Sequence, residues 1–162
     1  MAHKLHVTTG NASLRDLDEL LRIEQECFTK EAFTKEQMEV LLRNPNGIAF
    51  LARFMEEIVG FIIGEVENHG AVKTGHICTI DVAVKHRRRG VGLKLLKEVE
   101  NAFLQRSVEI CYLEVRADNY EASRLYEKQG YVELENLDNY YSGGEHGLRL
   151  VKLLKPKQSA SS

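Results

Sequence analysis

Hydrophobic positions follow two different periods along the chain, and the change between them predicts a mixed α/β fold. Apolar residues spaced three and four apart over 14–28 and again over 91–103 predict amphipathic helices. Runs rich in β-branched and aromatic residues predict strands between and after these helices. The predicted strands are 5–8, 48–54, 58–67, 76–84, 108–115, 131–137 and 147–154.

Local signals place the ends of the shorter elements. Thr34, with Gln37 three residues later, has the form of a capping box and predicts a helix that ends before the Asn44–Gly47 turn. Asp118 followed by Glu121 predicts the start of a further helix, and Gly130 stands where a left-handed C-terminal cap is expected. The short polar segment between the strands 48–54 and 58–67 predicts an antiparallel hairpin.

Composition narrows the class of protein. The 162 residues, 43% of them hydrophobic and 28% charged, suit one domain over 1–155, followed by a polar tail over 156–162 that we expect to be disordered. A formal net charge of -2 argues against a general nucleic-acid binder. Three cysteines without C-x-x-C spacing suggest neither a disulfide framework nor a metal site, and no apolar run is long enough for a signal peptide or a membrane span. We therefore expect a cytoplasmic protein that does not bind a membrane.

The segment Arg87–Gly92, "RRRGVG", ends the strand at 76–84 and opens the helix at 91–103. The first N–H groups of a helix lack intrahelical partners and attract anions, and glycines let a phosphate approach the backbone. The segment fits neither a Walker loop nor a dinucleotide-binding fingerprint, because Leu95 stands where the third glycine of the latter belongs. An ordinary turn with solvated arginines remains an alternative.

Two motifs together resemble the GCN5-related N-acetyltransferase (GNAT) family. They are R-x-x-G-x-G at 87–92 and N-x-x-A-x-x-L-Y-x-x-x-G-[FY] at 119–131, and the flanking strands are most similar to protein N-terminal acetyltransferases of the RimI and Ard1 kind. The resemblance implies a mostly antiparallel sheet of six to seven strands, splayed in the middle and flanked by about four helices. It also implies that acetyl-CoA is the cosubstrate. The residues implied to bind it are Ile80, Asp81, Val82, Arg87, Arg88, Arg89, Gly90, Val91, Gly92, Asn119 and Tyr126.

A carboxylate in the middle of an apolar strand is the main candidate for chemistry. Alternation in "CYLEV" puts Glu114 on the strand face opposite Cys111, Leu113 and Val115. From the residues alone, pairing with Arg116 or a backbone donor is the simpler explanation. The resemblance implies instead that Glu114 is the general base, acting through water, that Tyr126 is the acid for the departing thiolate, and that His76 assists as base or water holder.

The resemblance further implies that the N-terminus of a protein substrate, with ribosomal proteins among the candidates, lies in an apolar slot. Its walls would be Phe28, Phe33, Tyr140 and Tyr141, with Glu31 near the α-ammonium. Two alternatives stay open: an acetyltransferase acting on lysine side chains, polyamines or another small amine, and a non-catalytic CoA- or RNA-binding module. We expect a monomer or homodimer, no metal and no nucleic acid.

Overall fold

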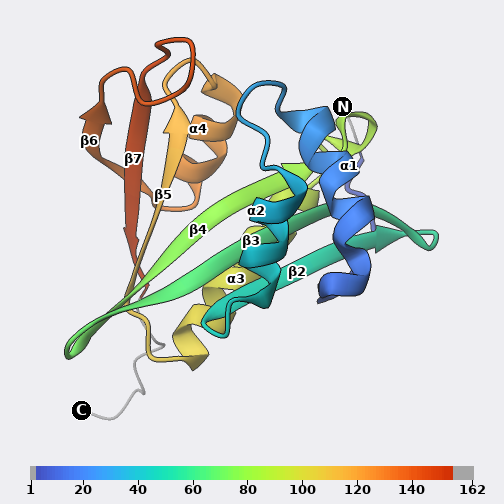
Figure 1. Ribbon diagram of the computed structural model, residues 1–162, viewed down its shortest axis with the longest axis horizontal. Helices are drawn as coiled ribbons and strands as arrows, with labels where there is room; N and C mark the ends of the chain where they lie inside the picture. The colour runs from blue at the N-terminus through green and yellow to red at the C-terminus, as the bar shows by residue number, and fades with distance from the viewer. Residues whose placement is uncertain (1–2, 155–162) are drawn as a thin grey trace. The chain divides into compact units, whose positions relative to one another are not determined.

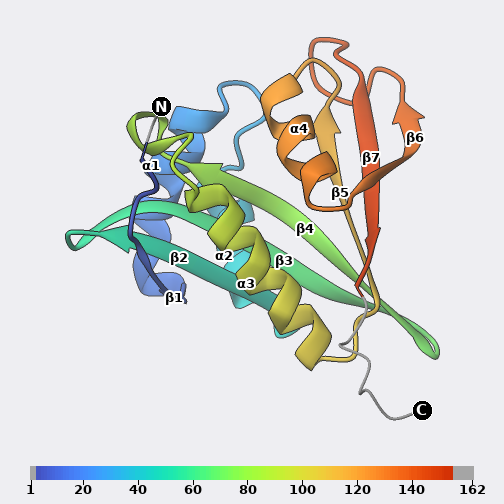
Figure 2. The ribbon, with the colours of Figure 1, turned by 180° about the vertical axis from the view of Figure 1, so that it is seen from behind.

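The computed structural model describes residues 3–154, and the predicted tail at 156–162 lies outside them. Within the described residues, the chain forms a seven-stranded sheet with the strand order β1-β2-β3-β4-β5-β7-β6, accompanied by four α-helices (Figures 1 and 2). The elements are β1 Thr8–Asn11, α1 Leu17–Cys27, α2 Lys35–Arg43, β2 Gly47–Phe54, β3 Glu57–His69, β4 Val72–Val82, α3 Val91–Gln105, β5 Ile110–Arg116, α4 Tyr120–Lys128, β6 Val132–Leu137 and β7 Gly147–Leu153. The expected mixed α/β class is confirmed.

Most of the strand pairs are antiparallel. β1 pairs with β2, β2 with β3, and β7 with both β5 and β6 in this way. β4 and β5 are parallel instead, and their pairing covers Thr74–His76 with Ile110–Tyr112. This short ladder accords with the expected parting of these two strands.

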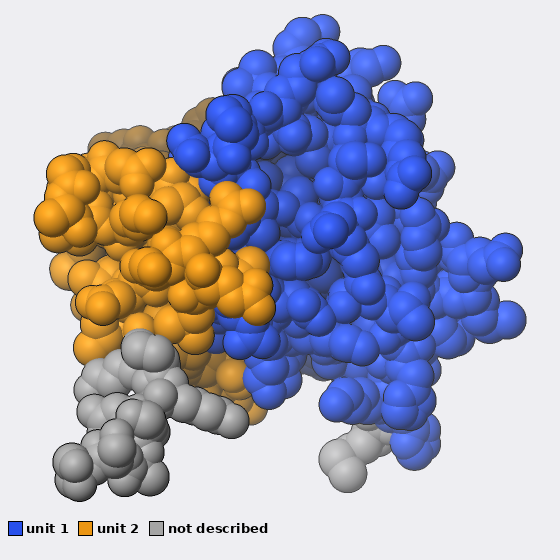
Figure 3. Space-filling view, turned by 90° about the horizontal axis from the view of Figure 1, so that it is seen from below, with its two compact units in different colours: residues 1–65, 77–101 blue, residues 66–76, 102–162 orange. Residues whose placement is uncertain are grey.

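The chain divides into two compact units, which Figure 3 colours separately. Unit 1 comprises residues 1–65 and 77–101, and unit 2 comprises residues 66–76 and 102–162. β3 and β4 therefore each contribute one part to each unit. The prediction of a single domain over 1–155 stays a prediction.

Unit 1 has its core between the paired helices α1 and α2 and the hairpin β2–β3. α1 and α2 lie on one face of these strands and α3 lies on the other (Figures 1 and 2). The predicted three-and-four spacing of apolar residues in α1 is what turns one face of that helix to the core. Complete burial of a leucine or phenylalanine contributes about 1.5–3 kcal/mol. The core cluster consists of Leu17, Leu20, Ile23, Met38, Leu51, Ile58, Phe61 and Ile63.

Unit 2 contains β5, β6 and β7 together with the parts of β3 and β4 within 66–76, and α4 lies against one face of β5–β7 (Figure 2). Alternate residues of β5 are buried, as the sequence pattern predicts: Cys111, Leu113 and Val115 face inward. The opposite face of β5 therefore remains for polar side chains.

The structure tests the predicted capping signals of α2 and α4. Thr34 Oγ1 accepts from the backbone N–H of Gln37, and the Gln37 side chain accepts from the Thr34 N–H, so the predicted capping box is confirmed. Gly130 has φ +95°, the left-handed conformation expected of a helix C-terminal cap. The prediction that Asp118 caps α4 was wrong. Asn119 is the cap, because its side chain accepts from the Ala122 N–H while Asp118 pairs with Arg116.

Several strand boundaries also differ from prediction, most of all the starts of β1 and β4. β1 begins at Thr8 instead of Leu5. Leu5 and Val7 are both buried, which explains why the apolar residues alternate there as they do in a strand. This segment does not pair with the sheet, and the Leu5 N–H donates instead to the Arg89 carbonyl in the turn before α3. β4 begins at Val72, because its first residues continue a hairpin with β3. None of the helices within residues 3–154 has the length and apolar character needed to cross a bilayer.

Candidate active site

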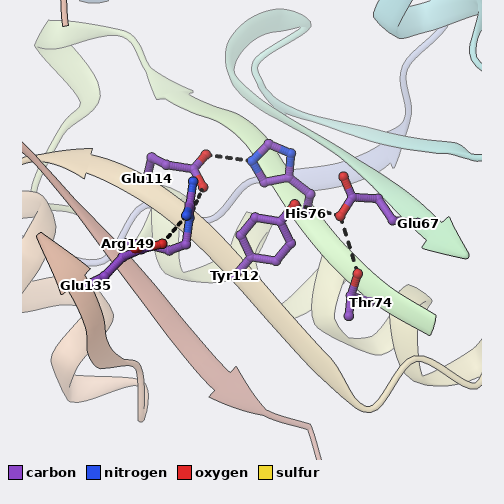
Figure 4. Close-up of polar contacts among 7 residues, drawn as sticks. All are labelled: Glu67, Thr74, His76, Tyr112, Glu114, Glu135 and Arg149. Atoms are coloured by element: carbon purple, nitrogen blue, oxygen red, sulfur yellow. Dashed lines mark hydrogen bonds and ion pairs between the residues drawn. The ribbon is translucent and has the colours of Figure 1, made fainter. Parts of the chain in front are cut away.

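Glu114 lies in the middle of β5, on the half-buried face of that strand, with 11% of its side chain exposed. One carboxylate oxygen, Oε1, is 2.7 Å from Nε2 of His76 in β4. The other, Oε2, accepts a hydrogen bond of 3.1 Å from Nε of Arg149 in β7 (Figure 4). Two cationic or potentially cationic groups on adjacent strands therefore hold the carboxylate from both sides.

His76 is fixed by packing as well as by its bond to Glu114. Its ring stacks on that of Tyr112, with centroids 4.6 Å apart and planes inclined by 12°. The preceding residue, Gly75, is in close contact with the Phe103 ring, since a Cβ there would lie 2.6 Å from the nearest ring carbon. The histidine side chain is thus held in one orientation on β4.

Arg149 extends the polar chain across the sheet to β6. Its guanidinium contacts Glu114 through Nε and Glu135 through Nη1 (Figure 4). It also lies over the Tyr112 ring, 5.9 Å from the centroid. Arg149 is the functional candidate that the sequence reasoning missed in this unit, because its partners come from two other strands and leave no local sequence signal.

A second set of hydrogen bonds involves the hydroxyl of Tyr112. The Tyr112 hydroxyl donates to Glu67 Oε1 at 2.6 Å, and Thr74 Oγ1 donates to the same oxygen at 3.3 Å (Figure 4). Burial, and after it Glu67, raises the pKa of Tyr112 far above its ordinary value. The Tyr112 hydroxyl therefore stays neutral and donates to Glu67, and this hydrogen bond holds the Tyr112 ring against His76.

The electrostatic balance at Glu114 favours its ionised form. Burial acts to raise the pKa of Glu114, but the hydrogen bond and charge of His76, and after them those of Arg149, outweigh it and hold the pKa below its ordinary value. A carboxylate in this state accepts hydrogen bonds and orients a water molecule, but it is a weak proton acceptor. The alternative that Glu114 pairs with Arg116 was wrong, because Arg116 binds Asp118 and Glu145.

The remaining predicted residues of unit 2 lie on α4 and in the β6–β7 loop. Tyr126 is 5% exposed, and its ring packs edge-on against Tyr131 at a centroid distance of 5.7 Å. Asn119, predicted to contact pantetheine, is the N-cap of α4. Tyr140 and Tyr141 make an edge-to-face pair with centroids 4.9 Å apart, and Tyr140 is 48% exposed.

In unit 1 the predicted anion site lies at the start of α3. Gly90 has φ +85°, and a Cβ added there would meet only the flexible Lys4 side chain, at 3.5 Å. The arginines beside it differ in their contacts. Arg87 donates to the Val82 carbonyl at 3.0 Å and Arg89 to the His3 carbonyl at 3.1 Å. Arg87 and Arg89 thus brace the turn, and the predicted anion site would consist of the backbone N–H groups at the start of this 15-residue helix.

The strand that leads to this turn presents two faces. Ile80 and Val82 are half-buried, whereas the Asp81 side chain points to the interior and is 1% exposed. There it approaches Thr79 and the buried Glu24 of α1. Sequence reasoning missed Glu24, since it lies within a helix whose apolar spacing gives no hint of a buried carboxylate. Phe28 and Phe33, predicted to contact substrate, are half-buried in the segment after α1, as is Glu31.

Comparisons with known proteins agree with the motifs. The model of the acetyltransferase (GNAT) family matches residues 17–131. An N-alpha-acetyltransferase of Sulfurisphaera tokodaii is 33% identical over 150 residues, which cover 83% of this chain and 86% of that protein.

Two solved structures have closely similar folds. Ard1 from Thermoplasma volcanium has a TM-score of 0.84 with 28% identity, covering 93% of this chain and 99% of that one. Arabidopsis thaliana Naa50, in complex with the bisubstrate analogue CoA-Ac-MVNAL, has a TM-score of 0.80 with 20% identity, covering 90% of this chain and 97% of that one. The family match spans well over half of the 162 residues. The chain belongs to the GNAT family and is an N-acetyltransferase.

Proposed function

We propose that this N-acetyltransferase transfers the acetyl group of acetyl-CoA to the α-amine at the N-terminus of a protein or peptide. The two substrates bind together, and the amine attacks the thioester directly. The observation that carries the proposal is the state of Glu114, a half-buried carboxylate that His76 and Arg149 keep ionised. The name of the Sulfurisphaera tokodaii relative supports the same acceptor.

A weak base suits an α-amine better than a lysine side chain. Attack requires a neutral amine, and the ordinary pKa values are about 7.7–8.0 for an α-amine and about 10.4 for lysine. At pH 7, deprotonation therefore costs about 1–1.4 kcal/mol for the α-amine and about 4.6 kcal/mol for lysine. Glu114, with its lowered pKa, is adequate for the first task and poor at the second.

The proton and electron balance of the step assigns a role to each residue. The amine nitrogen forms a bond to the acetyl carbon, and its proton passes through water to Glu114, which His76 keeps oriented. The carbon–sulfur bond then breaks, and the CoA thiolate takes a proton from Tyr126. Tyr126 regains that proton from solvent, and Glu114 releases the amine proton to solvent, so both residues return to their starting states. No covalent enzyme intermediate is required.

Acetyl-CoA fits the start of α3. The left-handed Gly90 and the unpaired N–H groups of the first helical turn suit a diphosphate, and Arg88 adds positive charge. The backbone of Ile80, Asp81 and Val82 pairs with pantetheine in this proposal, and Asn119 contacts it from α4. The Naa50 complex, whose ligand joins CoA, an acetyl group and a peptide, supports this choice of cosubstrate.

The acceptor peptide lies against the segment after α1 and the β6–β7 loop. The proposed contacts of its first side chain are Phe28 and Phe33 of unit 1 and Tyr140 and Tyr141 of unit 2, and the proposed contact of its α-ammonium is Glu31. The acceptors include the N-termini of ribosomal proteins in this proposal, the enzyme acts in the cytoplasm, and it works as a monomer or homodimer.

Two peptides of the same sequence test the acceptor. One has a free α-amine and acetylated lysines, and the other has a blocked α-amine and a free lysine. Incubation with acetyl-CoA followed by mass spectrometry is expected to show acetylation of the first at a rate at least about a hundredfold higher, given the difference in deprotonation cost. Preferential modification of the second peptide would overturn the proposal in favour of a lysine or small-amine acceptor.

A further inference from the structure

Two carboxyl groups are buried together in unit 1, apart from the network around Glu114. Glu24 of α1 and Asp81 of β4 are each 1% exposed. The hydroxyl of Thr79 lies between them, with Oγ1 3.1 Å from Glu24 Oε1 and 2.6 Å from Asp81 Oδ1. Carboxyl groups are seldom buried unless they are hydrogen-bonded or charge-paired, so this cluster requires a physical explanation.

If both carboxyl groups were ionised, as they ordinarily are at neutral pH, the Thr79 hydroxyl would supply the only hydrogen for the two contacts between these three side chains. The two contacts require a second hydrogen. A threonine hydroxyl has a single hydrogen and can donate to only one oxygen at a time. With both carboxyls ionised, one of the two short contacts would join oxygens with no hydrogen between them. One carboxyl is therefore protonated.

The surroundings assign that proton to Asp81. Glu24 accepts from two donors, Thr79 Oγ1 and the Phe33 backbone N–H at 3.0 Å, so each of its two oxygens already has a hydrogen-bond donor. Asp81 Oδ2 is buried and has no hydrogen-bond partner among residues 3–154, which an ionised carboxylate tolerates poorly. Burial, and after it the hydrogen bond and charge of Glu24, raises the pKa of Asp81 well above its ordinary value. The proton chain therefore runs from Asp81 to Thr79 and from Thr79 to Glu24.

The other titratable groups around Asp81 leave this assignment intact. Arg87, in the turn after β4, acts to lower the pKa of Asp81, but it comes last among the causes. Its own hydrogen bonds go to the Val82 carbonyl and to Cys27 Sγ. Burial, followed by Asp81, raises the pKa of Cys27 to about 11, so that thiol is neutral at pH 7.

Glu24 also fixes both ends of the segment that joins α1 to α2. Its backbone carbonyl accepts from the Phe28 N–H at 2.9 Å, and its side chain accepts from the Phe33 N–H. These are the two phenylalanines assigned to the acceptor slot. Through Thr79 the same side chain is tied to β4, next to the backbone assigned to pantetheine.

We propose that Glu24, Thr79 and Asp81 share one proton and act as positioning residues, which hold the segment 28–33 in the shape that receives the acceptor peptide. This inference rests on the proposed function for its effect on catalysis. The hydrogen-bond arrangement itself does not depend on which acceptor is used.

Glu24→Gln is the sharpest test. A glutamine side chain offers one carbonyl oxygen, so either the Phe33 N–H or the Thr79 hydroxyl loses its acceptor. We expect KM for the acceptor peptide to rise about tenfold, the effect of one lost hydrogen bond to a charged group, while KM for acetyl-CoA changes less than about twofold. Thr79→Val, which removes the central hydroxyl, should act in the same direction.

Glu19→Gln is the matched control, since Glu19 is an exposed residue of the same helix paired only with Arg22 in the described contacts. An equal rise of both KM values, or unchanged peptide KM, would overturn the positioning role.

Two measurements remain decisive if no peptide is acetylated or a variant is poorly folded. Amide hydrogen exchange of Phe33 is expected to be slow in the wild type and at least about tenfold faster in Glu24→Gln, because the lost hydrogen bond protects that amide. Infrared spectroscopy of the wild type at pH 7 should show the carbonyl band of a buried protonated carboxyl, which disappears in Asp81→Asn. If that band is absent from the wild type, the shared proton is wrong, whatever the enzyme acetylates.

Discussion

Glu114 in unit 2 and Asp81 in unit 1 are both shielded carboxyl groups on strands of one sheet, yet they hold opposite charge states. Glu114 has His76 and Arg149 as neighbours and stays ionised. Asp81 has another carboxyl, Glu24, across a hydroxyl and stays protonated. Burial disfavours the charge in both cases. The charge of the neighbouring side chains therefore decides whether the carboxyl group is ionised. At one pH the same fold keeps Glu114 as a proton acceptor and Asp81 as a hydrogen-bond donor.

The two groups also give opposite slopes of stability with pH. The pKa of Glu114 is lowered in the folded state, so its contribution to stability is present at neutral pH and is lost as the pH falls through the lowered value. The pKa of Asp81 is raised, so stability falls as the pH rises from its ordinary value of 3.8 through the raised one. Substitutions of Glu114, Arg149 and Asp81 each change the charge state of one of the two carboxyl groups or of its neighbour.

Removing the charge of Glu114 should have the largest effect. Glu114→Gln keeps the shape but cannot accept a proton, so kcat/KM for a free α-amine peptide is expected to fall by about 10²–10⁴. Steady-state assays of thiol release measure this, with circular dichroism to verify folding. Glu133→Gln, at an exposed position of β6, is the control and should retain activity. Activity of Glu114→Gln within threefold of wild type would exclude Glu114 as the base.

Removing only the cation beside Glu114 should make it behave more like Asp81. Without Arg149, burial is opposed by His76 alone, and the pKa of Glu114 rises. In Arg149→Met, the acid limb of the pH profile of kcat/KM is expected to move to higher pH, with a loss of about tenfold at the acid end and a smaller loss at the alkaline end. Arg149→Lys, which retains the charge, should show a smaller displacement. A uniform loss at every pH would mean that Arg149 has a structural role only.

Fixing Asp81 in its neutral form should have the smallest effect on activity, and it should change how stability depends on pH. In Asp81→Asn, the amide can donate to Thr79 as the protonated acid does, but it cannot ionise. A carboxyl that stays protonated at pH 7 costs the folded wild type about 1.4 kcal/mol for each pH unit above 3.8. The melting temperature of the variant relative to wild type is therefore expected to increase by about 10 °C between about pH 4 and pH 7. Thermal unfolding followed at several pH values measures it. A difference that stays constant with pH would show that Asp81 is ionised in the folded protein.

The fold was largely predictable from sequence, because periodicity and capping are local signals. The helix over 91–103, the Thr34 capping box and the alternation in β5 needed only neighbouring residues. The boundary of β1 was not predictable in this way, since burial of Leu5 and Val7 imitates a strand without pairing.

The candidate site was predictable in part. Glu114 stood out as a carboxylate among apolar residues, and the family resemblance indicated His76. Arg149 and Glu24 could not be found from sequence, because each acquires its role from partners 35 and 55 residues away, Glu114 and Thr79. Long-range polar contacts have no period, and the side chains that make them look like ordinary surface charges in the sequence.

Gly75 lacks a side chain because the Phe103 ring occupies the space where a Cβ would be, 2.6 Å from the nearest ring carbon. Even an alanine there would have to push that ring aside or shift β4, and His76 is the next residue along the strand. Gly75 is thus required by volume, whereas His76 is held by its contacts with Glu114 and Tyr112. The two requirements are independent, because replacing His76 would leave the Phe103 ring against Gly75 unchanged. A glycine at position 75 therefore indicates close packing and says nothing about catalysis.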